Sequence, residues 1–472
     1  MVGFDLDMTL IDTVVGFAAT LDALGAELGV QLPTRELTSK LGPPLEVLLE
    51  PHLPAEQVSP AADRFREIYP NLAVAPTPAL PGVAEALAAV RRHGGQILLV
   101  TGKHTPNAQL HVDHLGLDVD VVEGSVWGPG KGEVLLRHGA GVYVGDHVHD
   151  VEGARAAGVT SVSVLTGGCT RDELVAAGTD VVLDDLTDFP AWLDGFVLEQ
   201  RLAALDAHLR ELGRVLVAFS GGADSAFLLA AAVRALGAEH VAAATAYSDS
   251  LPGAERAPAR DFATSLGVEQ LTPQTHEMER AGYRANAGDR CAFCKAELLD
   301  VLGPLAREHG YDVVATGTNA DDARAGFRPG IAAAAEHGAA TPLLDAGLTK
   351  QQVRAASHAW GLPTWDKPAA ACLSSRIAYG IEITPSGLAR VERAEADLRA
   401  ALEEAGHRVG DLRVRDLGSG RARVEVDRAL VEEVAEHLAV VREAGFSRVE
   451  ADPLGFRSGS MNEMLADPER FR

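Results

Sequence analysis

The stretch RVLVAFSGGADS, from Arg214 to Ser225, decides the fold of the second half of the chain. It begins as an apolar run typical of a buried strand, passes through Ser220-Gly221-Gly222-Ala223-Asp224-Ser225 and continues as the helical pattern SAFLLAAAVRAL. The glycines let backbone N–H groups approach a phosphate, the serines add hydroxyl donors, and the helix N-terminus favours negative charge. Asp224 can help to hold a magnesium ion on such phosphates. The stretch predicts a strand, a phosphate-binding loop and a helix, without the Gly-Lys-Ser/Thr ending of the kinase P-loop.

Similar apolar runs in the first half of the chain end in reactive residues. MVGF runs into Asp5-Leu6-Asp7, QILLVT ends at Thr101, and GVYVGD ends at Asp146. Helical patterns separate these runs, and strands that alternate with helices indicate parallel, doubly wound sheets. In such sheets the chemistry lies where the carboxyl ends of strands meet loops. We therefore expect an α/β protein with two doubly wound domains, followed by a small α+β subdomain.

The pattern along the chain also predicts where these parts begin and end. The segment LTDFPAWLDGF closes the first part, which places a boundary near Gly195, and leucines between 198 and 212 recur as on an amphipathic helix. Thr384-Pro385 is a helix start, and LRVRDLGSGRARVEV reads as two strands around a Gly-Ser-Gly turn. The expected parts are residues 1–195 with a helical insert at about 12–80, residues 197–383, and residues 384–472.

Composition excludes several classes of protein. The 472 residues carry a net charge of −25, which gives no general affinity for nucleic acid. No apolar run approaches the roughly 20 residues of a membrane span. The N-terminus lacks the basic and apolar regions of a secretory signal. Four cysteines do not make a disulfide framework, so we expect reduced thiols, a cytoplasmic protein, and neither nucleic acid nor membrane as partner.

Residue types suited to phosphoryl transfer recur in order along the first part. This chemistry needs a nucleophile, a proton carrier, phosphate-holding donors and acids for magnesium, because its catalysis is mostly positioning and charge neutralisation. Any one of these aspartates alone is more often a turn or cap residue than a catalyst. The candidates are Asp5, Asp7, Thr101, Lys131, Asp146 and Asp150.

This order of motifs resembles the haloacid dehalogenase-like phosphatases, in their phosphoglycolate-phosphatase-like branch, over residues 1 to about 195. The helical insert corresponds to the cap of that family, and Lys103 is a rival for the lysine role because it lies close to Thr101. Two alternatives stay open, a working phosphatase of an intermediate or a damaged metabolite, and a non-catalytic regulatory unit. The resemblance implies a phosphoryl acceptor at Asp5, an acid/base at Asp7, phosphate holders at Thr101 and Lys131, and Mg²⁺ ligands among Asp5, Asp7, Asp146 and Asp150.

Several long motifs follow the phosphate loop in the second half. They are DRCAFCKAELL, GTNADDARAGFRPG, TPLLDAGLTKQQVR, GLPTWDKPAAACLSSRIAYGIEIT and FRSGSMNE. With the loop, which resembles that of ATP pyrophosphatases, they resemble the sulfur transferases of nickel-pincer nucleotide biosynthesis, the LarE family, from about residue 197 onward. The resemblance implies a homo-oligomer that acts on a pyridinium biscarboxylic acid mononucleotide. It also implies ATP binding by Ser220, Gly221, Gly222, Asp224 and Ser225.

The expected chemistry joins the phosphate loop to a cysteine. A carboxylate must be activated before sulfur can replace one of its oxygens, and an acyl adenylate made from ATP provides that activation. The thiolate of Cys372 can then attack the activated carbonyl carbon. In the LarE family, which this part of the chain resembles, the cysteine at this position supplies the sulfur. Breaking its C–S bond leaves dehydroalanine. The substrate-binding candidates are Arg376, Arg413 and Arg415, and Glu392 and Asp321 are weaker candidates for contact with a metal or the substrate.

Cys291 and Cys294, in Cys-Ala-Phe-Cys, form with Cys372 a set of three thiols. A branch of the resembling family holds a [4Fe–4S] cluster on three cysteines, whose open iron could carry an extra sulfide. Zinc binding and a purely structural role are the alternatives. Cys169 is expected to be an incidental thiol. A rival activity, ATP-dependent thiolation of transfer RNA, shares the loop and the cysteines, but the net charge argues against it.

Overall fold

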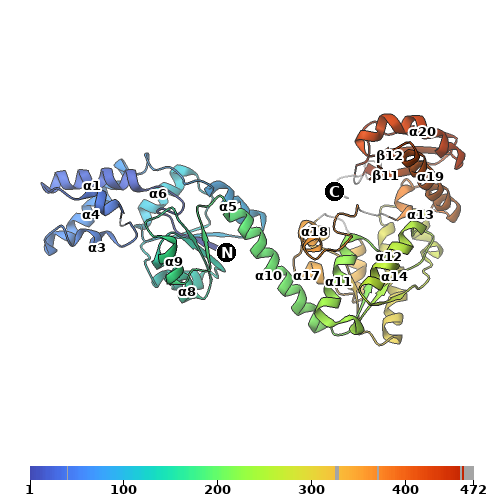
Figure 1. Ribbon diagram of the computed structural model, residues 1–472, viewed down its shortest axis with the longest axis horizontal. Coiled ribbons are helices and arrows are strands. Elements are labelled where there is room, and N and C mark those ends of the chain that lie inside the picture. The colour runs from blue at the N-terminus through green and yellow to red at the C-terminus, as the bar shows by residue number, and fades with distance from the viewer. Residues whose placement is uncertain (40, 325–328, 369–371, 458–459, 462–472) are drawn as a thin grey trace. The chain divides into compact units, whose positions relative to one another are not determined.

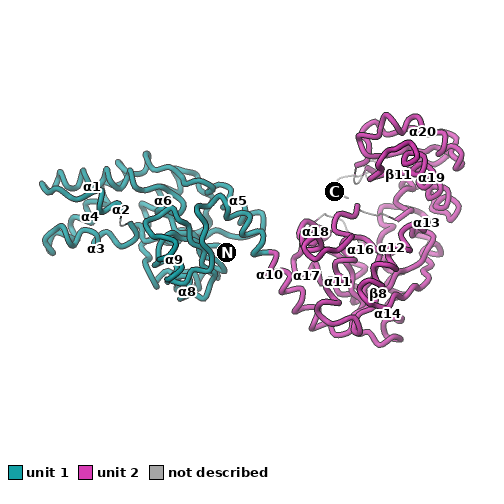
Figure 2. Tube along the Cα trace, in the orientation of Figure 1, with its two compact units in different colours: residues 1–197 teal, residues 198–472 magenta. Residues whose placement is uncertain are grey.

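The computed structural model of the protein describes residues 1–39, 41–324, 329–368, 372–457 and 460–461. These residues form two compact units, Met1–Val197 and Leu198–Arg472 (Figure 2). Parts of the predicted motifs GTNADDARAGFRPG, GLPTWDKPAAACLSSRIAYGIEIT and FRSGSMNE lie outside the described residues. In the part of the chain that the structure describes, no helix is long and apolar enough to cross a bilayer.

Unit 1, several of whose helices are labelled in Figure 1, is built on a six-stranded parallel sheet with the strand order β3-β2-β1-β4-β5-β6. Its strands are β1 (Val2–Phe4), β2 (Ile97–Val100), β3 (Val121–Glu123), β4 (Val142–Gly145), β5 (Thr160–Val164) and β6 (Val181–Leu183). Its helices are α1 (Val14–Leu28), α2 (Thr34–Ser39), α3 (Leu45–Leu49), α4 (Ala55–Leu72), α5 (Val83–Arg92), α6 (Thr105–Leu115), α7 (Gly130–Arg137), α8 (Val148–Ala157) and α9 (Arg171–Ala177). The predicted doubly wound fold is confirmed for this unit.

Alternation along the strands places apolar side chains on both faces of this sheet. Ile97 and Leu99 of β2 pack against one set of helices, whereas Leu98 and Val100 pack against α7 and α8 on the other face. Helices α1 to α4 have an apolar core of their own, which includes Phe17, and form the cap that the sequence places at about 12–80. Both faces of the sheet are therefore covered, and its carboxyl edge carries the candidate residues.

Helix α10 (Phe189–Leu212) passes through the division between the units. The sequence predicts a helix only from 198, but the observed helix begins nine residues earlier at Phe189. Phe189 and Leu193 belong to the core of unit 1, whereas Leu205 and Leu209 belong to a core of unit 2. The first turns are helical because their apolar residues are buried in unit 1.

Unit 2 contains a four-stranded parallel sheet, in the order β10-β7-β8-β9, and a three-stranded mixed sheet, in the order β11-β12-β13. Its strands are β7 (Val215–Ala218), β8 (Val241–Ala244), β9 (Glu269–Leu271), β10 (Val313–Thr316), β11 (Leu412–Asp416), β12 (Arg421–Val426) and β13 (Arg448–Ala451). Its α-helices beyond α10 are α11 (Ala223–Leu236), α12 (Gly253–Ser265), α13 (Ala281–Ala285), α14 (Arg290–Glu308), α15 (Ala320–Arg324), α16 (Pro329–Glu336), α17 (Pro342–Asp345), α18 (Lys350–Ala359), α19 (Pro385–Glu404) and α20 (Val431–Glu443). Short 3₁₀ turns include η3 (Leu373–Arg376).

The predicted elements of this unit are present in the structure. Strand β7 leads through the phosphate loop into α11, and α19 begins at Pro385 with Thr384 as its N-cap. The Gly-Ser-Gly turn joins β11 to β12, and Ser419 lies in the left-handed region with φ of 52°. The mixed sheet and the helices α19 and α20 share one apolar core.

Candidate active sites

The first candidate site lies at the carboxyl edge of the sheet in unit 1. Asp5 follows β1, Thr101 follows β2 and Asp146 follows β4, and these three strands are neighbours in the sheet. Lys131 lies in the first turn of α7, and Asp150 lies in the first turn of α8. All five residues are buried, with exposed fractions of 8% or less.

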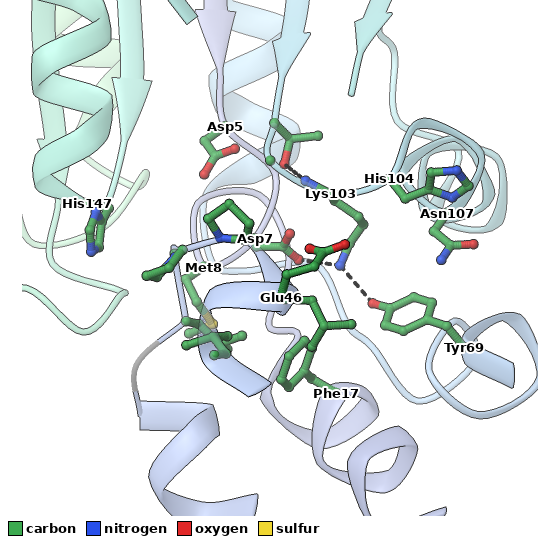
Figure 3. Close-up of a pocket in the computed structure, with 18 of the residues that line it drawn as sticks. Asp5, Asp7, Met8, Phe17, Glu46, Tyr69, Lys103, His104, Asn107 and His147 are labelled. Atoms are coloured by element: carbon green, nitrogen blue, oxygen red, sulfur yellow. Dashed lines mark hydrogen bonds and ion pairs between the residues drawn. The ribbon is translucent and has the colours of Figure 1, made fainter. Parts of the chain in front are cut away.

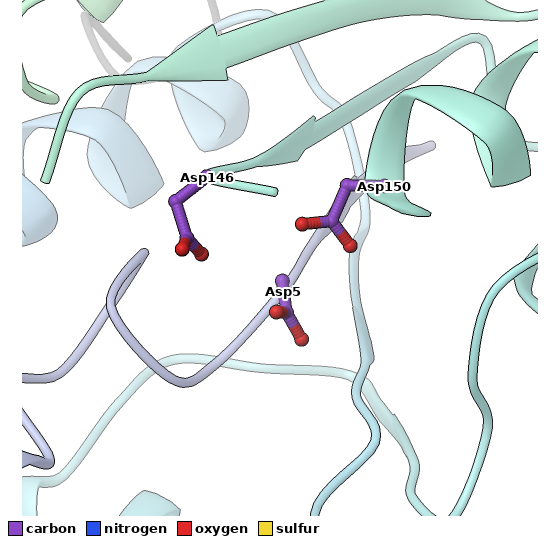
Figure 4. Close-up of side chains that lie close together, drawn as sticks. All are labelled: Asp5, Asp146 and Asp150. Atoms are coloured by element: carbon purple, nitrogen blue, oxygen red, sulfur yellow. The ribbon is translucent and has the colours of Figure 1, made fainter. Parts of the chain in front are cut away.

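Three of the carboxylates converge on one point (Figure 4). Oxygen atoms of Asp5, Asp146 and Asp150 lie within 4.8 Å of one another, and no other His, Cys, Asp or Glu set in the described residues does so. The Lys131 ammonium lies 3.2 Å from Asp5 and 2.6 Å from Asp150. One cation thus faces three buried acids.

This excess of negative charge fits a divalent cation. Burial raises the pKa of Asp5 to about 7 against the attraction of Lys131, and Asp150 adds to the increase. Burial also raises the pKa of Asp146 well above its usual range, with Asp150 and Asp5 as further causes. Mg²⁺ prefers hard carboxylate oxygens, so this set has the donors and the uncompensated charge that the ion requires.

Asp7 occupies a different position from the converging acids. Its carboxylate lies 2.7 Å from the Nζ atom of Lys103, which also donates a hydrogen bond of 2.8 Å to the Tyr69 hydroxyl of α4 (Figure 3). Lys103, the alternative lysine of the sequence analysis, therefore forms an ion pair with Asp7, whereas Lys131 forms one with Asp5. The sequence analysis does not identify Tyr69. This residue lies 34 positions before Lys103 in the chain, and only the folded cap brings the two side chains together.

The cap and the sheet edge enclose a pocket of about 130 Å³. Asp5, Asp7, Thr101, Lys131 and Asp146 all line it. Its cap side carries the apolar residues Phe17, Leu41, Leu48 and Phe65 and the ion pair of Glu46 with Arg66. The arrangement can hold a phosphoryl group over Asp5 and shield it from bulk water.

The second candidate site is the phosphate loop of unit 2. Gly221 has a φ of 73°, which a residue with a side chain rarely adopts, and Gly222 is the N-cap of α11. The hydroxyl groups of Ser220 and Ser225 lie 3.1 Å apart. The Ser225 hydroxyl donates a hydrogen bond to the Gly222 carbonyl. The loop therefore opens the helix N-terminus toward the adjacent cavity.

That cavity measures about 450 Å³ and has a cationic lining. Asp224 and Asp322 also line it. Burial raises the pKa of Asp224, the negative charge of Asp322 raises it further, and the positive charge of Lys350 lowers it. Asp321, the predicted candidate, instead accepts a hydrogen bond from the backbone N–H of Lys350. The cationic lining residues, which the sequence analysis does not identify, are Lys295, Lys350, Arg354 and Lys367.

The three predicted thiols lie within electrostatic reach of one another. Cys291 and Cys294 lie in the first turns of α14, directly before the cavity residue Lys295, and Cys372 precedes η3. Burial raises the pKa of Cys294, and the charges of Cys372, Glu277 and Cys291 raise it further. The three sulfur atoms do not meet within 4.8 Å, so in the described residues they do not form a single-ion site.

Arg290 is the cation that accompanies these thiols, and the sequence analysis does not identify it. Burial lowers its pKa, but the charges of Cys372 and Cys291 more than offset this and raise it above its usual value. Its guanidinium donates to the Ser374 carbonyl at 2.8 Å, which ties α14 to η3. A buried cation of this kind favours thiolates and other negatively charged sulfur.

A third cavity, of about 700 Å³, lies between α12, η3, α19 and β11. Arg376, Glu392 and Arg413 line it, whereas Arg415 does not. Arg415 instead pairs with the fully buried Glu425 at 2.8 Å. Both arginines lie on the same face of β11, as expected, but only Arg413 reaches the cavity. Cys169 lies apart in unit 1, where burial raises its pKa.

Comparison with known proteins identifies both units. Residues 2–128 match the model of the haloacid dehalogenase-like hydrolases, and residues 134–189 match a second model described as HAD-hydrolase-like. A phosphoglycolate phosphatase of Caulobacter vibrioides is 28% identical over 40% of this chain and 88% of its own.

Two other relatives each match 57% of this chain. Each match contains more residues than unit 1 does, so it must include residues of unit 2. An uncharacterized protein of Synechocystis is 40% identical over 99% of its own length. The pyridinium-3,5-bisthiocarboxylic acid mononucleotide synthase of Lactiplantibacillus plantarum is 32% identical over 96% of its own length. The chain therefore belongs to this synthase family of enzymes, the LarE family, and carries a haloacid dehalogenase-like phosphatase domain in its N-terminal part.

Proposed function

We propose that unit 2 inserts sulfur, at the expense of ATP, into a pyridinium biscarboxylic acid mononucleotide on the route to the nickel-pincer nucleotide. The observation that carries this proposal is the grouping of three thiols with two cavities in one unit. Cys294 directly precedes Lys295 of the 450 Å³ cavity, and Cys372 directly precedes Leu373 of the 700 Å³ cavity. Both volumes lie in the range of sites for molecules of nucleotide size.

The proposed reaction begins with the substrate carboxylate. One of its oxygens attacks the α-phosphorus of ATP, the bond to the β-phosphate oxygen breaks, and pyrophosphate leaves with the bonding electrons. A sulfur nucleophile then attacks the acyl carbon and AMP leaves. The phosphate loop, with Ser220 and Ser225, and the cations Lys295, Lys350 and Arg354 of the smaller cavity hold the triphosphate. Arg376 and Arg413 hold the nucleotide phosphate in the larger cavity, with Glu392 as a further contact.

Two sources of sulfur fit the thiols. In the first, Cys291, Cys294 and Cys372 hold a [4Fe–4S] cluster, which when bound would supply a transferable sulfide. In the second, Cys372 forms a thioester, loses its α-proton, and its Cβ–Sγ bond breaks, leaving dehydroalanine and a thiocarboxylate. The buried Arg290 and the spacing of the thiols favour the cluster over a single zinc ion, which would draw its ligand atoms together.

The test uses protein purified without oxygen. About four irons and at least four acid-labile sulfides per chain, lost in Cys291→Ala and in Cys372→Ala, are expected for the cluster. Protein without iron that becomes lighter by one H₂S after a turnover would establish the sacrificial cysteine instead. Thiolated substrate with neither iron nor a mass change would contradict both sources.

For unit 1 we propose a magnesium-dependent phosphomonoesterase. Asp5 attacks the phosphorus while Asp7 gives a proton to the leaving oxygen, and a water activated by Asp7 then releases phosphate from the aspartyl group. Thr101 and Lys131 hold the phosphoryl oxygens. Asp5, Asp146 and Asp150 would hold Mg²⁺, which when bound neutralises phosphoryl charge.

Asp5→Asn tests this activity against the alternative of a regulatory unit. We expect the variant to lose hydrolysis of p-nitrophenyl phosphate by at least a hundredfold, while the wild type requires Mg²⁺. Equal and slow hydrolysis by both proteins would mean that unit 1 senses phosphorylated ligands without turning them over.

The rival activity, thiolation of transfer RNA, has a separate test. A chain with net charge −25 should not be retained on transfer RNA even at low salt. Retention that falls steeply with added salt would favour the rival.

A further inference from the structure

Lys367 lies where the two cavities of unit 2 meet. Its side chain lines both the 450 Å³ cavity of the phosphate loop and the 700 Å³ cavity of Arg376 and Arg413. Pro368 also lines both cavities. Among the described lysine and arginine residues, Lys367 alone lines both.

The contacts of Lys367 fix its ammonium group at the phosphate loop. Its Nζ atom donates to the Gly221 carbonyl at 2.9 Å and pairs with Glu255 of α12 at 2.5 Å. Lys367 and Glu255 each keep 22% of their side chains exposed, so the pair faces the cavities rather than the core. An ammonium held by one carbonyl and one carboxylate has a third N–H left for a ligand.

We infer that Lys367 is a catalytic residue of the adenylylation step. This inference rests on the proposed function of unit 2. When the substrate carboxylate attacks the α-phosphorus, negative charge grows on the non-bridging oxygens of that phosphorus. An ammonium between the two cavities can contact those oxygens and the incoming carboxylate together, and so stabilises the transition state more than either ground state.

The other cations of the smaller cavity are placed differently. Lys295 and Lys350 line only the cavity of the phosphate loop. Their contribution is to hold the triphosphate in the ground state as well as in the transition state. A mutation there should raise the KM for ATP, whereas a mutation of Lys367 should lower kcat.

Glu255 gives Lys367 its orientation and is a positioning residue. It lines the substrate cavity but not the cavity of the phosphate loop. Glu255→Gln keeps a hydrogen-bond acceptor and removes the charge. We expect a smaller loss of kcat than in Lys367→Met, together with a KM for ATP that is unchanged.

The experiment is the exchange of radiolabelled pyrophosphate into ATP, which reports adenylylation without sulfur transfer. The full chain is assayed with pyridinium-3,5-biscarboxylic acid mononucleotide, and the dissociation constant of ATP is measured by calorimetry. For Lys367→Met we expect kcat of exchange to fall at least a hundredfold and the dissociation constant to change less than about threefold. The matched control Lys350→Met should raise the dissociation constant about tenfold and keep most of kcat at saturating ATP.

Two results would overturn the inference. Exchange by Lys367→Met at the wild-type rate would show that the ammonium plays no part. A loss confined to ATP affinity, as in the Lys350 control, would make Lys367 a binding residue only. A wild-type chain with no substrate-dependent exchange would instead contradict the proposed function itself. Lys367→Arg, which keeps the charge, should recover part of kcat if the folded site is intact.

Discussion

At the scale of single residues, a close approach between distant parts of the chain shapes the phosphate loop of unit 2. Gly317 follows β10 and lines the 450 Å³ cavity. A Cβ atom at this position would lie 2.8 Å from the backbone nitrogen of Ser225 and 3.0 Å from the carbonyl carbon of Asp224. Both atoms belong to the start of α11, so neither can yield without moving the phosphate loop.

Gly317→Ala should therefore weaken ATP binding without unfolding the protein. We expect the dissociation constant of ATP to rise at least tenfold in calorimetry, because the loop must move away from β10. Gly303→Ala is a matched control, since its Cβ would meet only a flexible arginine at 3.8 Å. Equal ATP affinity in both variants would show that the loop adapts.

His111 in unit 1 makes stability depend on pH. The residue is fully buried, and its Nε2 atom lies 3.0 Å from the Tyr69 hydroxyl. Burial lowers the pKa of His111 to about 4, and Lys103 contributes. The folded side chain stays neutral while the unfolded chain gains a proton below about pH 6.5. The free energy of unfolding therefore falls as the pH drops from about 6.5 toward 4.

His111→Gln should remove this part of the pH dependence. In urea unfolding between pH 7 and pH 4.5, we expect the free energy of unfolding of unit 1 to fall less steeply than in the wild type. The difference in slope should correspond to the uptake of up to one proton fewer on unfolding. A steeper slope in His111→Gln would contradict the assignment.

At the scale of elements, α19 supports the substrate cavity. Glu392 of this helix accepts the Gly253 N–H at 2.6 Å, and Glu395 accepts from Arg376 at 2.9 Å and from the Val414 N–H at 2.9 Å. The helix thus ties α12, η3 and β11 together. Its position depends on its own N-terminus.

Thr384→Ala should destabilise unit 2 by about 1 kcal/mol, because the Thr384 hydroxyl caps α19 by accepting the Gly387 N–H at 3.1 Å. Denaturant unfolding of the full chain, followed by hydrogen exchange in α19, measures the loss. Thr384→Ser keeps the oxygen and should lose only a few tenths of that amount. If serine costs as much as alanine, the cap contributes nothing.

At the scale of the whole molecule, the sites of the two units differ in size. The pocket of unit 1 measures about 130 Å³, whereas the cavities of unit 2 measure about 450 and 700 Å³. The pocket of unit 1 is thus several times smaller than the cavities proposed to bind nucleotides in unit 2. AMP, which sulfur insertion would release, is itself a nucleotide, whereas pyrophosphate is much smaller.

Unit 1 should therefore prefer small phosphate compounds. We expect kcat/KM for pyrophosphate or a two-carbon phosphate ester to exceed that for AMP at least a hundredfold, measured as phosphate release with Mg²⁺ present. Phe17→Ala and Leu48→Ala remove side-chain volume from the cap side of the pocket and so enlarge it. Both variants should raise the rate with AMP relative to the rate with the smaller substrates. A wild type that hydrolyses AMP fastest would show that the cap opens for larger substrates.

Local patterns in the sequence are sufficient to predict much of this molecule. The run from Arg214 to Ser225 predicts β7, the phosphate loop and α11, and the runs around Asp5, Thr101 and Asp146 predict three strands. These predictions succeed because period, glycine placement and strand-to-helix turns act within about ten residues. Strand β8 (Val241–Ala244) is not predicted, because three alanines carry no strand preference and only the neighbouring β7 and β9 make it one.

What the tertiary structure alone decides is which charged groups meet. Lys103 with Asp7, Lys367 with Gly221 and Glu255, and Arg415 with Glu425 are pairings that no local pattern predicts. Asp322 rather than its neighbour Asp321 reaches the 450 Å³ cavity for the same reason. Residue type determines what a side chain can do, but packing over up to 146 residues of separation determines what it faces. The sequence by itself therefore determined the fold class and the candidate reacting groups, and the folded chain determined which of these groups lie together.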